Sequence, residues 1–236
     1  MSRAEYVETF EDGPGGWNGW ISNFEGPRPL EYVDQTITSR SPWWIDYNHA
    51  PPGAGYLHML ASLNTSGPQP EAVREIGGHN RFIEGGYRLD FADAEMTVRL
   101  KGELLKQGAE VVVLIQGVVE GICSGWVLTG QPIPVTGDWS EQTVTFAPDP
   151  AQWKPLGCRH DRTDMYGVKP LPQILSNVST NVMLILFPLN VVPMGPIDGD
   201  PHILRAGWDY PVWRSKLPEG YVTFGEVRIR FDRCIE

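Results

Sequence analysis

An alternation of apolar and polar residues with a period of two limits most strongly what this chain can fold into. It is clearest over residues 221–232. The odd-numbered positions there carry Tyr, Thr, Gly, Val, Ile and Phe, and the even-numbered positions from 226 onward carry Glu, Arg, Arg and Asp. Successive side chains of a β-strand point to opposite faces of its sheet, so one face of this segment packs and the other meets water. Residues 96–101 and 143–146 show the same pattern and are also predicted strands.

Two unbroken apolar runs, Val111–Ile115 and Val182–Phe187, have the length of a strand. Because they show no alternation, both of their faces should be covered, and we expect them to be central strands. Weaker strand candidates are residues 4–10, 35–39, 56–63 and 122–129, which brings the total to about eight to ten. Only Pro172–Val178 has a helical pattern, with Pro early and apolar residues at helical spacing.

Glycine and proline are frequent, with 26 and 21 of 236 residues, which favours many turns over long helices. We therefore predict an all-β fold, an antiparallel two-sheet jelly-roll β-sandwich with long loops and at most one or two short helices, formed by residues 1–236 as a single domain. Residues 40–54, 64–80 and 188–220 are too long for hairpin turns, and we expect these connections to build the functional site at one mouth of the sandwich.

The charge balance limits the partners of the chain. Nineteen basic and 29 acidic side chains give a net charge of −10, which argues against binding to nucleic acid. Acidic residues stand within the first eight positions, where a secretion signal needs an apolar stretch, and the run over residues 182–189 is too short to cross a bilayer. We expect a cytoplasmic protein with no membrane partner. The three cysteines form no Cys-x-x-Cys pair and predict no disulfide framework.

Three short segments, residues 8–13, 137–146 and 225–229, resemble the galactose-binding-domain-like jelly rolls that include many carbohydrate-binding modules. The resemblance implies the sandwich fold and, more generally, sugar binding. It also implies a structural calcium between the first and last strands, and Glu8, Glu11 and Asp232 occupy broadly similar places here.

A proline-flanked segment contains adjacent tryptophans, Trp43 and Trp44, followed by Asp46, Asn48 and His49. Sugars present apolar CH patches on one face and hydroxyls around the edge, so an aromatic platform rimmed by an acid, an amide and an imidazole would complement them. The alternative is that the large rings cap the open end of the sandwich.

A dense charged run, Arg159, His160, Asp161 and Arg162, is the second candidate. Arginine binds carboxylates or phosphates in a bidentate manner and histidine titrates near neutrality, so in an enzyme Arg159, His160 and Asp161 would be catalytic and Arg162 would contact the ligand. The alternative is a solvated turn whose charges pair locally.

A third set, Asp198, Asp200 and His202, alternates along the chain. On an extended backbone these side chains share one face and suit a single divalent metal ion. The alternative is turn formation, which Asp-Gly and Asp-Pro favour.

A glycine-rich segment adds Asn80 and Arg81 as ligand contacts, with turn formation as the alternative, and Trp208 is a further aromatic candidate. His58 lies on a predicted strand, where a histidine satisfied within the sheet is the expected role.

The leading hypothesis is the binding of a carbohydrate or small polar ligand by loops at one mouth of the sandwich. One alternative is an intracellular lyase or hydrolase on a carbohydrate-like or carboxylated metabolite, with or without a metal. The other is an accessory subunit that docks another protein through its aromatic loop. The sequence leaves the ligand, the catalytic capacity, the bound metal (a structural calcium or a single divalent ion) and the oligomeric state open.

Overall fold

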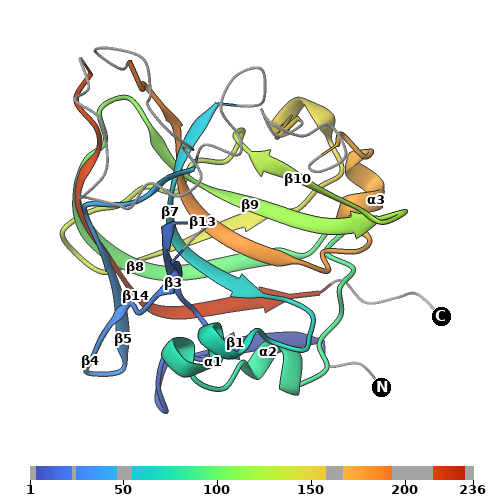
Figure 1. The fold of residues 1–236 in the computed structure, drawn as a ribbon, viewed down its shortest axis with the longest axis horizontal. Helices are drawn as coiled ribbons and strands as arrows, with labels where there is room; N and C mark the ends of the chain where they lie inside the picture. The colour runs from blue at the N-terminus through green and yellow to red at the C-terminus, as the bar shows by residue number, and fades with distance from the viewer. Residues whose placement is uncertain (1–3, 23–24, 47–54, 158–166, 193–214, 232–236) are drawn as a thin grey trace.

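Two six-stranded antiparallel sheets lie face to face and enclose the core (Figure 1). This is a computed structural model, and it describes residues 4–22, 25–46, 55–157, 167–192 and 215–231. The predicted all-β sandwich of two antiparallel sheets is confirmed.

The first sheet is built around the longest strand of the chain, β14 (Glu219–Arg230), which carries the alternation seen in the sequence. Its order is β11 (Ser140–Thr145), β8 (Glu95–Leu105), β14, β5 (Thr36–Arg40) and β4 (Glu31–Val33), and β1 (Glu5–Glu8) also pairs with β14.

The second sheet contains both unbroken apolar runs. Its order is β12 (Trp153–Pro155), β10 (Ile122–Leu128), β9 (Glu110–Val119), β13 (Asn181–Leu189), β7 (Tyr56–Asn64) and β6 (Ile45–Asp46). A separate two-stranded ribbon of β2 (Gly19–Ser22) and β3 (Gly26–Arg28) is joined to β7 by two backbone hydrogen bonds between Asn18 and Ser62.

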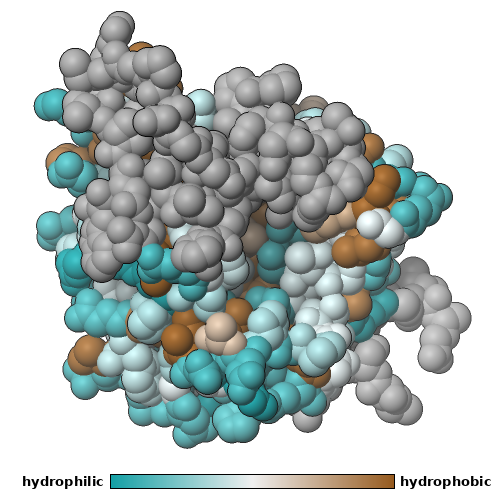
Figure 2. All heavy atoms as spheres, viewed as in Figure 1, coloured by the Kyte–Doolittle hydropathy of each residue, from teal (hydrophilic) through white to brown (hydrophobic). Residues whose placement is uncertain are grey.

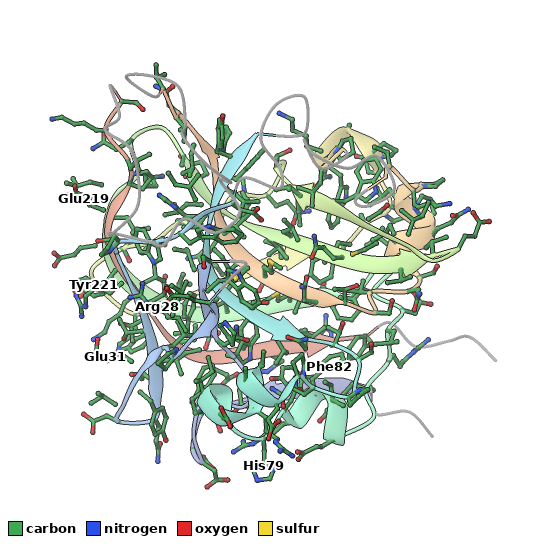
Figure 3. All side chains as sticks on the ribbon, in the orientation of Figure 1. Arg28, Glu31, His79, Phe82, Glu219 and Tyr221 are labelled. Atoms are coloured by element: carbon green, nitrogen blue, oxygen red, sulfur yellow. The ribbon has the colours of Figure 1, made fainter. Side chains whose placement is uncertain are left out.

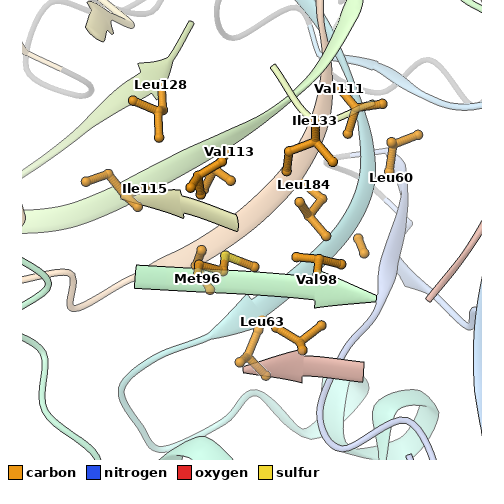
Figure 4. Packing of buried hydrophobic residues seen from close by; sticks show 14 of the residues in the cluster. Leu60, Leu63, Met96, Val98, Val111, Val113, Ile115, Leu128, Ile133 and Leu184 are labelled. Carbon is orange, nitrogen blue, oxygen red and sulfur yellow. The ribbon is translucent and has the colours of Figure 1, made fainter. Parts of the chain in front are cut away.

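The main core lies between the two sheets, where Met96 and Val98 of β8 face Val113 and Ile115 of β9 (Figure 4). A second apolar cluster lies on the other side of the second sheet, with Trp20 packed against it. Its buried members are Leu57, Met59, Val112, Leu114, Val127, Leu156, Met183, Ile185 and Phe187. Both faces of β9 and β13 are thus covered, as the unbroken apolar runs predicted.

A bulge in β7 determines which of its residues face outward. The pairing with β13 shifts between Leu184 and Ile185, and one extra residue of β7 is accommodated there. Leu60 and Ala61 both belong to the core between the sheets, whereas Met59 belongs to the outer cluster. The bulge therefore lets Met59 and Ser62, which differ in parity, reach the same outer face.

The described part of the chain contains three short α-helices, whereas the sequence predicted one or two at most: α1 (Glu71–Gly77), α2 (Arg81–Glu84) and α3 (Leu171–Leu175). A 3-10 helix, η2, spans Pro150–Gln152. The first two α-helices lie in or next to residues 64–80, which were predicted to be a loop. They were not predicted because one or two turns are too short for helical periodicity to appear. No helix in the described part of the chain combines the length and the apolarity needed to span a bilayer.

Candidate functional site

A pocket of about 190 Å³ opens on the outer face of the second sheet, beside the ribbon of β2 and β3. Its aromatic and apolar lining comes mainly from Trp20, Trp44, Met59 and Met183. Its polar lining comes mainly from Asn18, Asp46, Ser62, Asn64, Gln116 and Asn181. On the described surface visible in Figure 2, hydrophilic residues predominate and hydrophobic ones form small areas.

Three amide side chains stand side by side across the floor of this pocket. Asn181 of β13 is paired with Asn64 of β7 on one side and with Gln116 of β9 on the other. Directly opposed residues of antiparallel strands bring their Cβ atoms to about 5 Å, so the three amides form one row. The row offers carbonyl acceptors and N–H donors over a surface the width of three strands.

Three buried polar atoms of residues that line the pocket have no hydrogen-bond partner among the described residues. They are Oδ1 of Asn18, Oδ1 of Asn181 and Nε1 of Trp44. The amide of Asn18 is held by Nδ2, which donates to the carbonyl of Gly19 at 2.7 Å. A buried polar group left unpaired costs about 1–3 kcal/mol, so a molecule that supplies hydroxyl groups here would be favoured.

Asp46 lies in strand β6 and Trp44 directly precedes it, and both side chains line the pocket. His58 holds this segment in place through a hydrogen bond to the backbone of Trp44. Nδ1 of His58 is 2.9 Å from the carbonyl oxygen of Trp44, to which its N–H donates. Burial lowers the pKa of His58 to about 4, although the bond to the Trp44 carbonyl acts in the opposite direction. The imidazole is therefore neutral at pH 7, which confirms the expected histidine satisfied within the sheet.

The two adjacent tryptophans lie on different sides of the chain. Trp44 is 2% exposed and lines the pocket. Trp43 is 3% exposed, belongs to the core between the sheets and donates from Nε1 to Oγ of Ser39 at 2.9 Å. The structure does not bring the two rings together in one platform, because successive residues of an extended chain point in opposite directions.

Asn80 and Arg81, predicted as ligand contacts, are held by bonds within the fold and lie outside this pocket. Asn80 is the N-cap of α2: Oδ1 accepts from the N–H of Ile83 at 2.9 Å and Nδ2 donates to the carbonyl of Asn64 at 2.8 Å. Arg81 pairs with Glu8 at 3.2 Å and Asp12 at 3.0 Å. The structure does not bring these two side chains together with Trp44.

Glu8, which pairs with Arg81, is also one of the residues near which the family resemblance implied a structural calcium. Glu8 is fully buried, and its Oε1 accepts from the N–H of Phe10 at 2.8 Å, while Oε2 has no partner among the described residues. Burial raises the pKa of Glu8, opposed by the Phe10 N–H and by Arg81. Glu11 is exposed, and a guanidinium supplies the positive charge beside Glu8. Asp232, the third residue of the implied set, lies outside the described residues.

Many predicted site residues lie outside the described residues: Asn48, His49, Arg159, His160, Asp161, Arg162, Asp198, Asp200, His202, Trp208 and Asp232. The structure describes neither the predicted catalytic set nor the predicted divalent-metal set. Within the ranges that it does describe, no three His, Cys, Asp or Glu residues are grouped so as to hold a metal ion.

No motif in the sequence marks Asn18, Trp20, Gln116 or Asn181 as site residues. A signal was present for two of them. Gln116 shares the parity of Val112 and Leu114, and Asn181 that of Met183, so each is a polar residue at the end of the outward-facing row of a central strand. The row of amides also depends on which strands are neighbours in the sheet. The alternation within one strand predicts which residues face outward, but not which strand lies beside it.

Comparisons with known proteins do not assign this chain to a family. No protein-family model matches it, and no curated protein matches it. Among solved structures it is similar to the L4b domain of human laminin alpha-2, at 8% identity, a TM-score of 0.40 and coverage of 97% of this chain and 98% of that one. It is also similar to the CBM2 module of the evolved Dit of Lactobacillus casei BL23 phage J-1, at 12% identity, a TM-score of 0.29 and coverage of 99% and 100%. Likenesses at these scores carry no argument about function.

Proposed function

We propose that the pocket on the outer face of the second sheet binds a carbohydrate or a similar polyhydroxylated molecule. The observation that carries the proposal is the set of three buried, unpartnered atoms of residues around one pocket: two carbonyl acceptors, on Asn18 and Asn181, and one donor, on Trp44. A hydroxyl group both donates and accepts, so adjacent sugar hydroxyls match a site that needs both functions.

The rest of the lining suits a neutral sugar. Trp20, Met59 and Met183 offer apolar surface to the CH groups of a sugar ring, and the amides of Asn64 and Gln116 add polar contacts. In the described part of its lining the pocket has neither Arg nor Lys. With about 190 Å³, the pocket is smaller than the roughly 300–1,000 Å³ sites that hold drug-sized ligands, so it suits a single sugar unit or the end of a chain.

The acidic groups of the lining favour binding over hydrolysis. Among the described residues that line the pocket, Asp46 is the only carboxylate. Most glycoside hydrolases use two carboxyl groups that flank the scissile bond. The geometry therefore supports a recognition site, and calorimetry with a panel of monosaccharides and short oligosaccharides tests it, because the absence of heat across the panel would contradict sugar binding.

Trp44→Phe should weaken sugar binding about fivefold to tenfold. The substitution keeps an aromatic ring but removes Nε1–H, and one hydrogen bond contributes roughly 1 kcal/mol. Titration of each sugar by calorimetry or by protein NMR measures the change. The free protein should lose little stability from the missing donor itself, because that donor has no partner to lose.

Trp43→Phe is the matched control for this prediction. It removes the same kind of N–H from the neighbouring position, but that N–H is bonded to Ser39 inside the fold and the ring does not line the pocket. The control should lower the melting temperature and leave the affinity unchanged. Equal affinity of Trp44→Phe and the natural protein would remove the donor of Trp44 from the proposal.

A further inference from the structure

A second depression, of about 670 Å³, lies on the outer face of the first sheet and is unrelated to the sugar pocket. We call it the cationic groove. Its main residues are Thr38, Arg40, Arg99, Lys101, Trp139 and Tyr221. They come from β5, β8 and β14 and from the turn that precedes β11. Figure 3 labels Glu31 and Tyr221 on this side of the molecule.

Cationic groups lie over aromatic rings on both sides of the groove. The guanidinium carbon of Arg99 is 4.3 Å and Nζ of Lys101 is 4.8 Å from the ring centre of Trp139. Across β14, the guanidinium carbon of Arg40 is 4.9 Å from the ring centre of Tyr221. Cation–π contacts of this kind hold the charged groups in place while their N–H donors remain available.

Neither Arg99 nor Lys101 forms an ion pair with another described residue. No described carboxylate lies within 4.0 Å of either side chain. Two glutamates, Glu226 of β14 and Glu141 of β11, are opposite Arg99 in the strand register. Glu226 pairs with Arg228, and Glu141 forms no ion pair with a described residue. Together with Arg40, these two residues place three cationic side chains along the groove, in a chain of net charge −10.

The floor between the two cationic walls is hydroxylated. Thr38 of β5 and Thr223 of β14 are directly opposed, and their Oγ1 atoms are 2.8 Å apart. Arg40 lies on β5 and Lys101 on β8, with β14 between them, so the two walls stand about 10 Å apart. A matching ligand needs separated negative charges with hydroxyl groups between them.

We propose that the cationic groove binds an acidic oligosaccharide. Carboxylate or sulfate groups of the sugar chain pair with Arg99, Lys101 and Arg40, and hydroxyl groups of the intervening sugars contact the threonine floor. Arg40 also pairs with the exposed Glu31 at 3.3 Å, an exchangeable surface interaction. Asp34 is the one carboxylate among the described residues of the groove lining. Charges spaced along a sugar chain fit the separated walls better than a densely charged polymer.

Binding of oligogalacturonate, dextran sulfate and neutral dextran, measured by calorimetry at low and moderate salt, tests the proposal. We expect one or both acidic saccharides to bind, neutral dextran not to bind at this groove, and affinity to fall with added salt. The two acidic probes show whether carboxylate or sulfate is preferred. Absence of binding by both would overturn the proposal, and equal binding of poly-glutamate would replace it with an acidic-peptide site.

The double variant Arg99→Gln/Lys101→Gln should weaken acidic-saccharide binding about tenfold. Trp139→Leu should weaken it as well, because both cations lose the ring that holds them. The control is Arg230→Gln/Lys106→Gln, which also removes one Arg and one Lys charge, but from exposed positions outside the groove. An equal loss in the control would mean that net charge, and not the groove, attracts the saccharide. Dependence on Arg99 and Lys101 identifies binding here, whereas dependence on Trp44 identifies binding in the sugar pocket.

Discussion

Arg81→Met should lower the free energy of unfolding at pH 7 by about 3 kcal/mol. The substitution keeps much of the side-chain length but removes the guanidinium that pairs with the fully buried Glu8 at 3.2 Å. A buried carboxylate without a positive partner is costly, and Oε2 of Glu8 already has no hydrogen bond from the described residues. Denaturant unfolding followed by tryptophan fluorescence measures the loss.

The dependence of this loss on pH identifies its cause. Burial already raises the pKa of Glu8, and removal of Arg81 should raise it further. A carboxyl group with a raised folded-state pKa is tolerated when protonated and destabilises the fold as the pH rises through that pKa. The deficit of Arg81→Met should therefore shrink in acid and be full at neutral pH.

Glu8→Gln completes the test as a double-mutant cycle with Arg81→Met. In the double variant no buried charge remains, so most of the lost stability should return. Arg230→Gln is the surface control: it breaks the exposed ion pair with Glu95 and should cost less than 1 kcal/mol. If Glu8→Gln restores nothing, the loss comes from packing of the Arg81 side chain and not from charge.

His58 should make the fold sensitive to acid, with a loss of roughly 3 kcal/mol between about pH 6.5 and pH 4. Its pKa is lowered by burial from 6.5 to about 4. Between these values the unfolded chain binds a proton that the folded chain does not. Stability is therefore fully present above pH 6.5 and is lost as the pH falls toward the folded-state pKa.

His58→Asn isolates this contribution. Asparagine keeps an N–H donor close to the position from which Nδ1 reaches the carbonyl of Trp44, but it does not titrate. The variant should be less stable at pH 7 because it leaves a small cavity, and its stability should vary less between pH 4 and 6.5. Urea unfolding at a series of pH values measures both effects. A pH profile parallel to that of the natural protein would show that other groups produce the acid sensitivity.

Much of the scaffold was predictable because strand parity is a local property. The alternation over residues 221–232 became β14, and the unbroken runs became β9 and β13, covered on both faces. The Pro172–Val178 helix appeared at Leu171–Leu175, displaced by a few residues.

The site was less predictable, because it depends on contacts between distant segments. Aromatic and acidic residues cluster around Trp44 and Asp46 in the sequence, and both of these residues line the pocket. Asn181 and Gln116 meet only because β13 lies beside β9, and Ser62 joins Met59 only because of the bulge in β7. The ion pair between Arg81 and Glu8 could not be predicted from the sequence for the same reason, because Glu8 is 73 positions earlier in the chain.

The lengths of the outer strands have a consequence for behaviour at high concentration. β4, β6 and β12 each have only two or three residues, and β1 has four. The unpaired backbone groups of an edge strand can pair with another copy of the chain, which is how identical molecules stack into fibrils. A short edge strand offers few backbone hydrogen bonds for such growth. β11, with six residues, is the longest of these edge strands, and Glu141, its second residue, places a negative charge where a second copy would have to dock.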